Sequence, residues 1–386
     1  MFSRFFFVIL VVFGAYLTLV YYSRLQDIRA NMKEMHYVVH KNMKYILQWT
    51  RKFSAPFDSM DTGNSAFTKN KCKYTNCYVT DDDSFLDLAD FDAVAFNGRD
   101  VIHLWPFQMP QKRSPKQKYI FGAMESPDNF PACDSMLDNY FNWTWTYKLD
   151  SDFRWGYITI YDTEGKVVGP AIDMKWPEDM DPISEDLKAK LSSKSKAAAW
   201  FVGHCKTRNK REDFVEELKE ELAQFGWEVD IYGACGELSC PASESKTCFK
   251  LVENDYYFYL SLENSFSEDY VTEKLLTALD NYAVPIVFGG ANYSRFLREG
   301  SYLDARKLGA KNLARAMSEI IGNKSMYHDF FRWRNHFVYK RTSDNVDICR
   351  LCEVLNDDQM NSGACVRRRP SRAASTPVTN TSSSRR

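Results

Sequence analysis

Residues 256–290 read YYFYLSLENSFSEDYVTEKLLTALDNYAVPIVFGG, and this stretch decides the fold. It begins with an aromatic and apolar run (256–264), continues with a segment of helical character (270–282) and ends in a second apolar run (284–290). Short apolar runs on either side of a helix are typical of a β-α-β unit, in which the helix joins two parallel strands. The stretch therefore predicts a mostly parallel, buried sheet.

The same alternation continues upstream of this stretch. Residues 197–203 (AAAWFVG) and 227–233 (WEVDIYG) predict two more strands, and the apolar residues between them recur at helical spacing until Gly226 ends the helix. The positions that carry this helical spacing are Phe214, Leu218, Leu222 and Phe225. Residues 186–355 are therefore predicted to form one α/β domain.

A second α/β domain is predicted for residues 71–185. It contains three short apolar segments flanked by polar loops, as buried strands would be. These segments are residues 92–96 (DAVAF), 101–104 and 118–123 (KYIFGA). A Pro-containing acidic stretch after residue 170 separates them from the strands of the other domain. The sequence thus predicts two α/β domains in one chain.

The overall charge of the chain is balanced. The 386 residues contain 50 Lys and Arg against 51 Asp and Glu, for a net charge of -1. This balance lacks the basic footprint of a nucleic-acid-binding protein, so we expect no nucleic-acid partner. Residues 356–386 are basic and of low complexity with almost nothing to bury, and are predicted to be a disordered tail.

The amino terminus has the composition of a membrane anchor. Residues 5–22 (FFFVILVVFGAYLTLVYY) carry no formal charge over about the minimum length of a membrane-spanning helix. The span ends in aromatic residues, without the small-residue cleavage site of a signal peptide. We predict a cytosolic end (1–4), an uncleaved signal anchor (5–22) and a polar stem (23–70).

The orientation of this anchor rests on two opposed signals. More positive residues follow the span than precede it, which favours a cytoplasmic body. Ten cysteines and four N-x-S/T sequons favour an oxidising lumen, and we give the cysteines more weight. The sequons are at Asn142, Asn292, Asn323 and Asn380. We therefore predict a single-pass type II protein with a lumenal body.

The cysteines allow two interpretations. Cys72 and Cys77 form one closely spaced pair and Cys349 and Cys352 another, as in a disulfide framework. The alternative is a zinc site with these four thiolates as ligands.

The strongest candidate site lies where the strand at 256–264 passes into the following helix. Ligands of open α/β sheets bind at such strand ends. Glu273 and Lys274 fall in the first helical turn, where backbone N–H groups and a lysine favour a phosphate. The alternative is an ordinary helix start with an acidic first turn.

The basic loop at 204–211 follows another predicted strand. Its arginines have the geometry to clamp a diphosphate. The alternative is a run of charged residues that are simply exposed to solvent.

Two further motifs carry acidic residues. Glu125 follows the predicted strand at 118–123, a position suited to a general base, although an isolated Glu is more often structural. Asp150 and Asp152 have the spacing of a carboxylate pair that holds a divalent cation against a diphosphate, but acidic pairs are common in loops.

These motifs together resemble the α1,3-fucosyltransferases, Golgi type II membrane enzymes that use GDP-fucose. The resemblance rests on FGAMESP, NWTWTYKLDSD, AAWFVGHCKTRNKRE, the stretch from FYLSLENS to VFGGANY, and the closing CRLC. It implies a GT-B architecture, with two Rossmann-like domains facing a cleft, the acceptor glycan on the N-terminal domain and GDP-fucose on the C-terminal one.

Carried over position by position, the resemblance assigns roles to single residues. Glu125 becomes the catalytic base and Arg211 a diphosphate contact. The other donor-binding residues are Asn264, Tyr270, Glu273 and Lys274. The resemblance also implies that the cysteine pair at 72 and 77 is tied to the pair at 349 and 352. Cys205 and Cys248 are further disulfide candidates.

The resemblance implies the inverting transfer of L-fucose in α1,3 linkage to a GlcNAc-containing glycan of a glycoprotein, at the Golgi membrane. No cofactor is required, and stimulation by a divalent cation stays open. One alternative is a catalytically silent lumenal protein that binds glycans with the same fold. Another is a metal-dependent transferase that uses Asp150 and Asp152.

Overall fold

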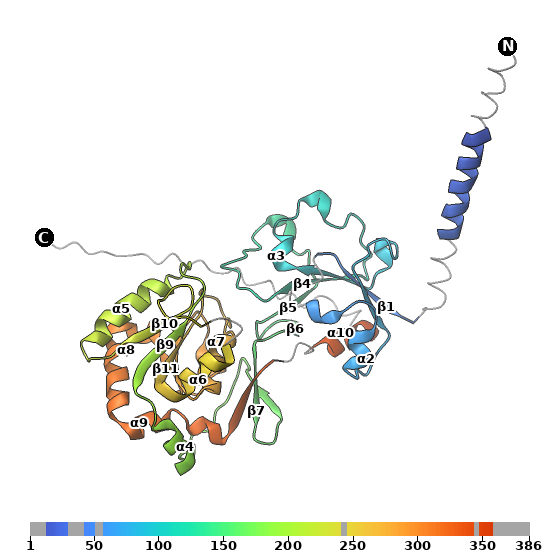
Figure 1. Ribbon diagram of the computed structural model, residues 1–386. Helices are drawn as coiled ribbons and strands as arrows, with labels where there is room; N and C mark the ends of the chain where they lie inside the picture. The colour runs from blue at the N-terminus through green and yellow to red at the C-terminus, as the bar shows by residue number, and fades with distance from the viewer. Residues whose placement is uncertain (1–12, 30–41, 51–56, 241–244, 343–346, 358–386) are drawn as a thin grey trace.

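The computed structural model describes residues 13–29, 42–50, 57–240, 245–342 and 347–357. Two α/β bodies lie side by side, and a helix over residues 13–29 stands apart from both (Figure 1). Within the described part of the chain, no helix has the length and apolar character needed to cross a bilayer. Residues 5–12 of the predicted anchor and the predicted tail from 358 onward lie outside the described residues.

The N-terminal body is built on a six-stranded sheet in the order β2-β1-β3-β4-β5-β6. All neighbouring strands in it are parallel. Its strands are β1 (Lys44–Gln48), β2 (Cys77–Thr80), β3 (Ala93–Asn97), β4 (Lys118–Ala123), β5 (Trp143–Thr146) and β6 (Phe153–Arg154). Its helices are α2 (Ser65–Lys69), α3 (Gly98–Val101) and α10 (Ile348–Asn356).

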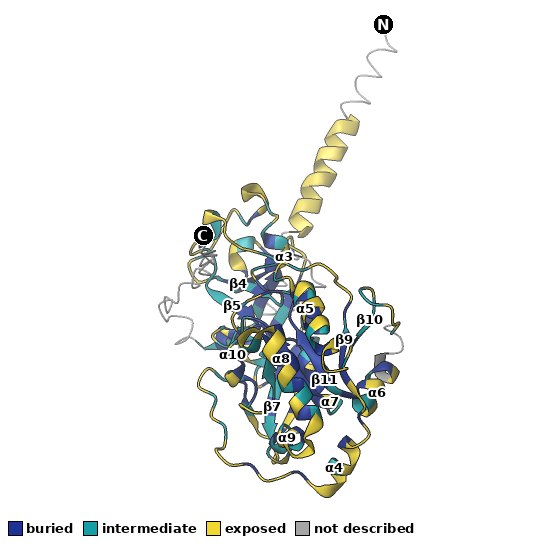
Figure 2. Ribbon diagram, turned by 90° about the vertical axis from the view of Figure 1, so that its left-hand side faces the viewer, coloured by how far each residue is buried: buried dark blue, intermediate teal, exposed yellow. Residues whose placement is uncertain are grey.

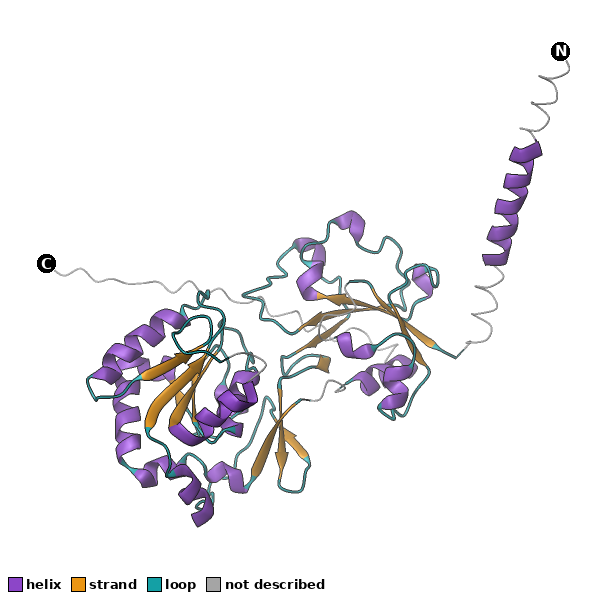
Figure 3. Ribbon diagram, viewed as in Figure 1, coloured by secondary structure: helices purple, strands orange, loops and turns teal. Residues whose placement is uncertain are grey.

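The C-terminal body is built on a five-stranded parallel sheet in the order β10-β9-β11-β12-β13. Its strands are β9 (Lys196–Phe201), β10 (Val229–Tyr232), β11 (Tyr256–Leu262), β12 (Val284–Phe288) and β13 (Leu303–Asp304). Its helices are α4 (Glu185–Leu191), α5 (Arg211–Ala223), α6 (Ser245–Asp255), α7 (Glu273–Asp280), α8 (Ala305–Gly322) and α9 (Lys324–Asp329). Helices α5 and α8 cover one face of this sheet, and α6 and α7 cover the other (Figures 1 and 3).

The two large sheets share one strand order. In each, the second strand in sequence lies outside the first, and the later strands follow on the other side. The order therefore reverses between β1 and β3 in one sheet and between β9 and β11 in the other. Open parallel sheets bind their ligands outside the carboxyl ends of the strands at this switch point. The topology thus marks two places for ligands, one on each body.

The central strands of the C-terminal sheet, β9, β11 and β12, are buried along most of their length, as Figure 2 shows for β9 and β11. Every residue of β12 is buried, and so is nearly every residue of β11. Strands covered by helices on both faces have continuous apolar runs, because neither face meets water. The β11, α7 and β12 elements predicted from residues 256–290 are confirmed.

A small third sheet and helix α10 bring the chain back from the C-terminal body. Strands β7 (Ile158–Asp162), β8 (Val167–Gly169) and β14 (Phe337–Arg341) form this antiparallel sheet. Helix α10 then buries its apolar face against the N-terminal sheet. The predicted end of the second domain at residue 355 is therefore wrong, since residues 348–356 pack on the first body. Only the tertiary structure shows which body covers the apolar face of α10.

The predicted boundaries need two further corrections. Residues 44–48 (KYILQ) form β1 between β2 and β3, so the predicted stem (23–70) ends before residue 44. A five-residue strand among polar segments gives no periodic signal, so sequence reasoning misses it. Residues 101–104, predicted as a strand, complete α3 and the turn after it. Asn97 begins this helix, because its side chain accepts a hydrogen bond from the backbone nitrogen of Arg99 (2.9 Å).

The described residues contain four disulfides. Cys72 is bonded to Cys349 and Cys77 to Cys352, which fixes α10 to the N-terminal body. The alternative zinc site is thereby ruled out, because these sulfurs are not free thiolates. Cys205 is bonded to Cys235, and Cys240 to Cys248.

A buried lysine closes the junction between α6 and β11. Lys194 donates hydrogen bonds from Nζ to the backbone carbonyls of Val252 (3.1 Å), Glu253 (2.8 Å) and Tyr256 (2.8 Å). No residue separates the end of α6 from the start of β11, so these carbonyls have few other donors within reach. Burial lowers the pKa of Lys194 to about 7.

This pKa predicts a pH dependence of stability. Between pH 7 and about 10 the folded protein binds fewer protons at Lys194 than the unfolded chain. The free energy of unfolding of the wild type, relative to Lys194→Met, should therefore increase with pH, by up to about 1.4 kcal/mol per unit. Urea unfolding at pH 7, 8 and 9 measures this difference, with the exposed Lys311→Met as the control. A constant difference would contradict the prediction.

Candidate functional site

The candidate site lies where the two bodies touch. The loop after β4 meets the loop after β11, with the Ser126 and Ser265 hydroxyls 2.5 Å apart. Asn129 donates a hydrogen bond to the side-chain oxygen of Asn264 (3.2 Å). Farther along, the hydroxyls of Tyr147 and Ser267 lie 3.0 Å apart. The carboxyl ends of strands from both sheets therefore face one another at this interface.

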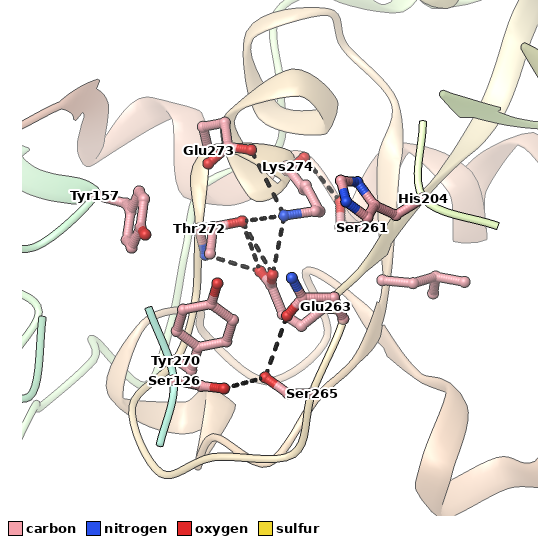
Figure 4. Close-up of polar contacts among 12 residues, drawn as sticks. Ser126, Tyr157, His204, Ser261, Glu263, Ser265, Tyr270, Thr272, Glu273 and Lys274 are labelled. Atoms are coloured by element: carbon pink, nitrogen blue, oxygen red, sulfur yellow. Dashed lines mark hydrogen bonds and ion pairs between the residues drawn. The ribbon is translucent and has the colours of Figure 1, made fainter. Parts of the chain in front are cut away.

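The centre of the C-terminal side is a buried carboxylate. Glu263 follows β11 and has only 2% of its side chain exposed. It accepts hydrogen bonds from the backbone nitrogen (2.8 Å) and hydroxyl (3.0 Å) of Thr272 and from Nζ of Lys274 (3.1 Å), as Figure 4 shows. The charge of Glu263 is thus paired with a cation and hydrogen-bonded. This network fixes the first turn of α7 to the end of β11.

Lys274 is held in place by several groups at once. Besides Glu263, its Nζ contacts the hydroxyl of Thr272 (2.7 Å) and lies 3.5 Å from Glu273. Burial lowers the pKa of Lys274, but the charges of Glu263 and Glu273 outweigh burial, and the pKa stays above its ordinary value. Lys274 is therefore a fixed cation beside a helix N-terminus, and part of its side chain remains exposed.

Glu125 reaches this interface from the N-terminal body. Its Oε2 accepts hydrogen bonds from the hydroxyl of Tyr270 (3.0 Å) and from Asn129 (3.4 Å). Burial raises the pKa of the Tyr270 hydroxyl far above its ordinary range, and the charge of Glu125 adds to the effect. Tyr270 therefore stays protonated and keeps donating to the carboxylate. The rings of Tyr147 and Tyr157 pack against Tyr270 and hold it in place.

Arg211 lies behind the site. Its guanidinium is buried and donates hydrogen bonds to the backbone carbonyls of Leu262 and His204. Burial lowers the pKa of Arg211, and the charge of Glu263 opposes that effect. The diphosphate contact expected of Arg211 stays a prediction. In the observed contacts, Arg211 supports the loop after β9.

The structure brings Asn264, Tyr270, Glu273 and Lys274 together on the loop after β11 and the start of α7. The side chain of Glu273 is half exposed at this position. Asp150 and Asp152 are exposed and lie in the turn between β5 and β6 of the N-terminal body. Asp152 accepts hydrogen bonds from the backbone and hydroxyl of Thr144 (both 2.9 Å), and Asp150 lies 3.5 Å from Lys148. Among the described residues, no group of acidic, His or Cys side chains has the arrangement of a metal site.

The predicted glycosylation sites differ in exposure. Asn292 and Asn323 are exposed and begin short helices, with their side-chain oxygens accepting backbone hydrogen bonds. Asn142 is half-buried, and its side-chain oxygen accepts from the backbone of Tyr119 (2.8 Å) and from Arg113. Asn380 lies outside the described residues.

Sequence reasoning missed three residues of the site. Glu263 and Thr272 are the partners that hold Lys274, and Asn129 joins Glu125 to the loop after β11. The one signal in the sequence that could have identified Glu263 is a charged residue at the end of an otherwise apolar strand. Its pairing with a lysine eleven positions away becomes visible only once α7 folds back on β11.

The chain is similar to known proteins along most of its length. A family model described as "Fucosyltransferase, N-terminal" matches residues 41–158, and "Glycosyltransferase family 10 (fucosyltransferase) C-term" matches residues 191–367. Alpha-(1,3)-fucosyltransferase C of Drosophila melanogaster is 36% identical over 86% of this chain and 77% of its own. Alpha-(1,3)-fucosyltransferase fut-1 of Caenorhabditis elegans is 27% identical over 84% of this chain and 69% of its own. The 4-galactosyl-N-acetylglucosaminide 3-alpha-L-fucosyltransferase FUT6 of Pan troglodytes is 30% identical over 81% of this chain and 79% of its own.

The Glu263 network predicts a strong energetic coupling. Glu263→Gln leaves Lys274 without its buried partner and should reduce the free energy of unfolding by about 3–5 kcal/mol. The double variant Glu263→Gln/Lys274→Met should lose less than the sum of the two single variants, because the charges are removed together. Urea unfolding of the four proteins measures the coupling. The exposed Glu268→Gln is the control and should cost about 1 kcal/mol or less. Additive losses would contradict the network.

Proposed function

Because the chain belongs to glycosyltransferase family 10, the fucosyltransferases, we propose that it transfers L-fucose from GDP-fucose, in α1,3 linkage, to a GlcNAc-containing glycan. The relatives named above are α1,3-fucosyltransferases that cover most of both chains. The observation that carries the proposal is the position of Glu125, 3.0 Å from Tyr270 on the loop that leads to Lys274. A carboxylate on one body then faces a fixed cation and a helix N-terminus on the other, as expected of a GT-B enzyme with its site in the cleft.

We assign the donor to the C-terminal body. The N-terminus of α7 offers backbone N–H groups and a favourable dipole to the diphosphate of GDP-fucose. Lys274 adds a full positive charge that stabilises the leaving diphosphate. Asn264 and Glu273 offer hydrogen bonds to the hydroxyls and base of the nucleotide sugar. Arg211 holds the loop after β9 and the end of β11, so that these groups keep their positions.

We assign the acceptor to the N-terminal body and the role of base to Glu125. In an inverting transfer the acceptor hydroxyl attacks the fucose carbon opposite the diphosphate, and one C–O bond forms as the other breaks. Glu125 takes the proton of that hydroxyl, and the diphosphate leaves toward Lys274. Tyr270 and Asn129 both donate to Oε2, so we assign Oε1 to the acceptor proton. Their hydrogen bonds orient the carboxylate before the substrate arrives.

Two substitutions test the role of the base and the role of the donor site separately. Glu125→Gln should reduce kcat by about 10²- to 10⁴-fold while GDP still binds, because the amide cannot take the proton. Lys274→Ala should weaken GDP binding by about tenfold or more, because a charge-assisted contact is lost. Initial rates with GDP-fucose and calorimetry with GDP measure the two effects, at a temperature at which circular dichroism shows each variant to be folded, because Lys274→Ala also loses the partner of Glu263. A Glu125→Gln protein with most of its kcat would exclude Glu125 as the base.

The same assay decides between the enzyme and the silent glycan-binding alternative. A panel of an N-glycan core and N-acetyllactosamine antennae also identifies the acceptor, and runs with and without a divalent cation measure any stimulation. Binding of glycans without transfer or hydrolysis of GDP-fucose would favour the silent protein.

We further propose that residues 5–22 anchor the chain in the Golgi membrane with its body in the lumen. Support comes from the apolar character of this segment and from four disulfides, which persist in oxidising compartments.

Sealed microsomes test this topology. Added protease should leave the body intact until detergent opens the vesicles. Endoglycosidase should increase the mobility of the wild-type chain, and a smaller shift is expected for Asn292→Gln. Digestion of the body in sealed vesicles would place it in the cytoplasm.

A further inference from the structure

The N-terminal body presents two large aromatic side chains to solvent. Trp105 is 66% exposed and Phe107 is 75% exposed. Outside the helix at 13–29, they are the most exposed large apolar side chains of the described residues. A single exposed apolar residue is common, whereas two rings on either side of an exposed Pro106 form one apolar surface, which marks an interaction site. We call residues 105–107 the aromatic tip.

Hydrogen bonds hold the aromatic tip in a fixed conformation. The backbone nitrogen of Trp105 donates to Oε1 of Gln108 (2.9 Å). The side chain of Gln111 donates to the carbonyls of Pro106 (2.9 Å) and Met109 (2.6 Å). Met109 is buried in the core of the N-terminal body and fixes the end of this turn. The two rings are therefore held in solvent by an ordered turn.

The charges around the tip suit a lipid surface. Residues 101–118 contain no Asp or Glu, and Lys112, Arg113 and Lys116 are exposed. Aromatic rings beside Lys and Arg are typical of the membrane–water interface, where the rings lie among the headgroups and the cations meet the phosphates. Carboxylates are also close, since Asp83 and Gln108 line one cavity. We therefore assign a zwitterionic surface, phosphatidylcholine, rather than an anionic one.

The proposed anchor would keep this body near a membrane. Residues 23–41 separate the apolar span from Asn42, where the described N-terminal body begins. A fully extended chain covers about 3.5 Å per residue, so this connection reaches at most about 70 Å. A short connection gives an effective concentration of about a millimolar, at which even a weak contact is occupied. Two aromatic rings are then sufficient for a second point of attachment.

We propose that the aromatic tip inserts into the headgroup region of the membrane that holds the chain. The inference rests on the proposed membrane anchor and adds to it a second contact, which fixes the orientation of the body over the bilayer. It does not depend on the fucosyl transfer. The other possible occupants of the tip are a second protein and another part of this chain, and the experiment separates them from lipid.

Brominated lipid tests the contact directly, because bromine in the acyl chains quenches the emission of a tryptophan that touches it. The full chain is placed in phosphatidylcholine vesicles with and without brominated acyl chains. The difference in emission between the wild type and Trp105→Phe reports Trp105 alone among the nine Trp residues. This difference should be smaller in the brominated vesicles. The matched control is Trp176→Phe, at a half-buried ring that packs on β14, and its difference should be the same in both lipids.

A second substitution removes the contact and keeps the reporter. Phe107→Asp places a charge on the tip, and the transfer of a charge out of water is unfavourable, so the quenching of Trp105 should be lost. Phe225→Asp, at an exposed position in the turn after α5, should retain the quenching. Circular dichroism should show the same melting temperature for Phe107→Asp and the wild type, because the side chain at 107 is exposed.

The outcomes separate the tip from the anchor. If the wild type stays in the vesicles at alkaline pH and Trp105 emits equally in both lipids, the inference is wrong and the anchor stands. If alkaline pH releases the wild type, the anchor is wrong, and flotation with phosphatidylcholine vesicles at neutral pH tests the tip alone. Flotation that is lost in Phe107→Asp supports the inference. Equal flotation of both proteins, or none, overturns it.

Discussion

The buried charge of Glu263 is the constraint on which the rest of the site depends. A carboxylate without solvent must be paired and hydrogen-bonded, and its partners are Thr272 and Lys274. Satisfying that charge fixes the start of α7 against the end of β11. The loop between them, residues 264–270, then has both ends fixed, and this loop carries Tyr270 to Glu125 on the other body. One buried ion pair therefore sets the position of the cation, the helix N-terminus and the partner of the proposed base.

The loop is also fixed along its length, which explains how two bodies make one site. Asp269 pairs with Arg295 (2.8 Å) and accepts a hydrogen bond from the backbone of Leu149 in the N-terminal body (3.2 Å). A Cβ at Gly290 would lie 2.5 Å from the backbone nitrogen of Ser267, so the loop passes too close to β12 for a side chain there. At the far side, α10 and its two disulfides return the chain to the first body.

How much the sequence predicts depends on how local the determining forces are. β11, α7 and β12 were predictable because burial on both faces requires apolar runs, and those runs are printed in the sequence. β1 was missed because its place between β2 and β3 comes from pairing with strands far along the chain. The site shows the same division. The residues on the loop after β11 were identified from one motif, whereas the hydrogen bonds from Tyr270 and Asn129 to Glu125 depend on how two domains meet.

The chain is nearly neutral overall, but the distribution of its charges over the two bodies matters for the chemistry. A net charge of -1 indicates no strong field around the whole molecule, yet the two sides of the proposed site carry groups of opposite charge. The C-terminal body presents Lys274, a cation kept charged by a buried acid, and the N-terminal body presents the carboxylate of Glu125. On the proposed assignment, the anionic diphosphate meets the cation and the acceptor hydroxyl meets the carboxylate. Because the strand order is the same in both sheets, it is the side chains and not the topology that distinguish the two sides.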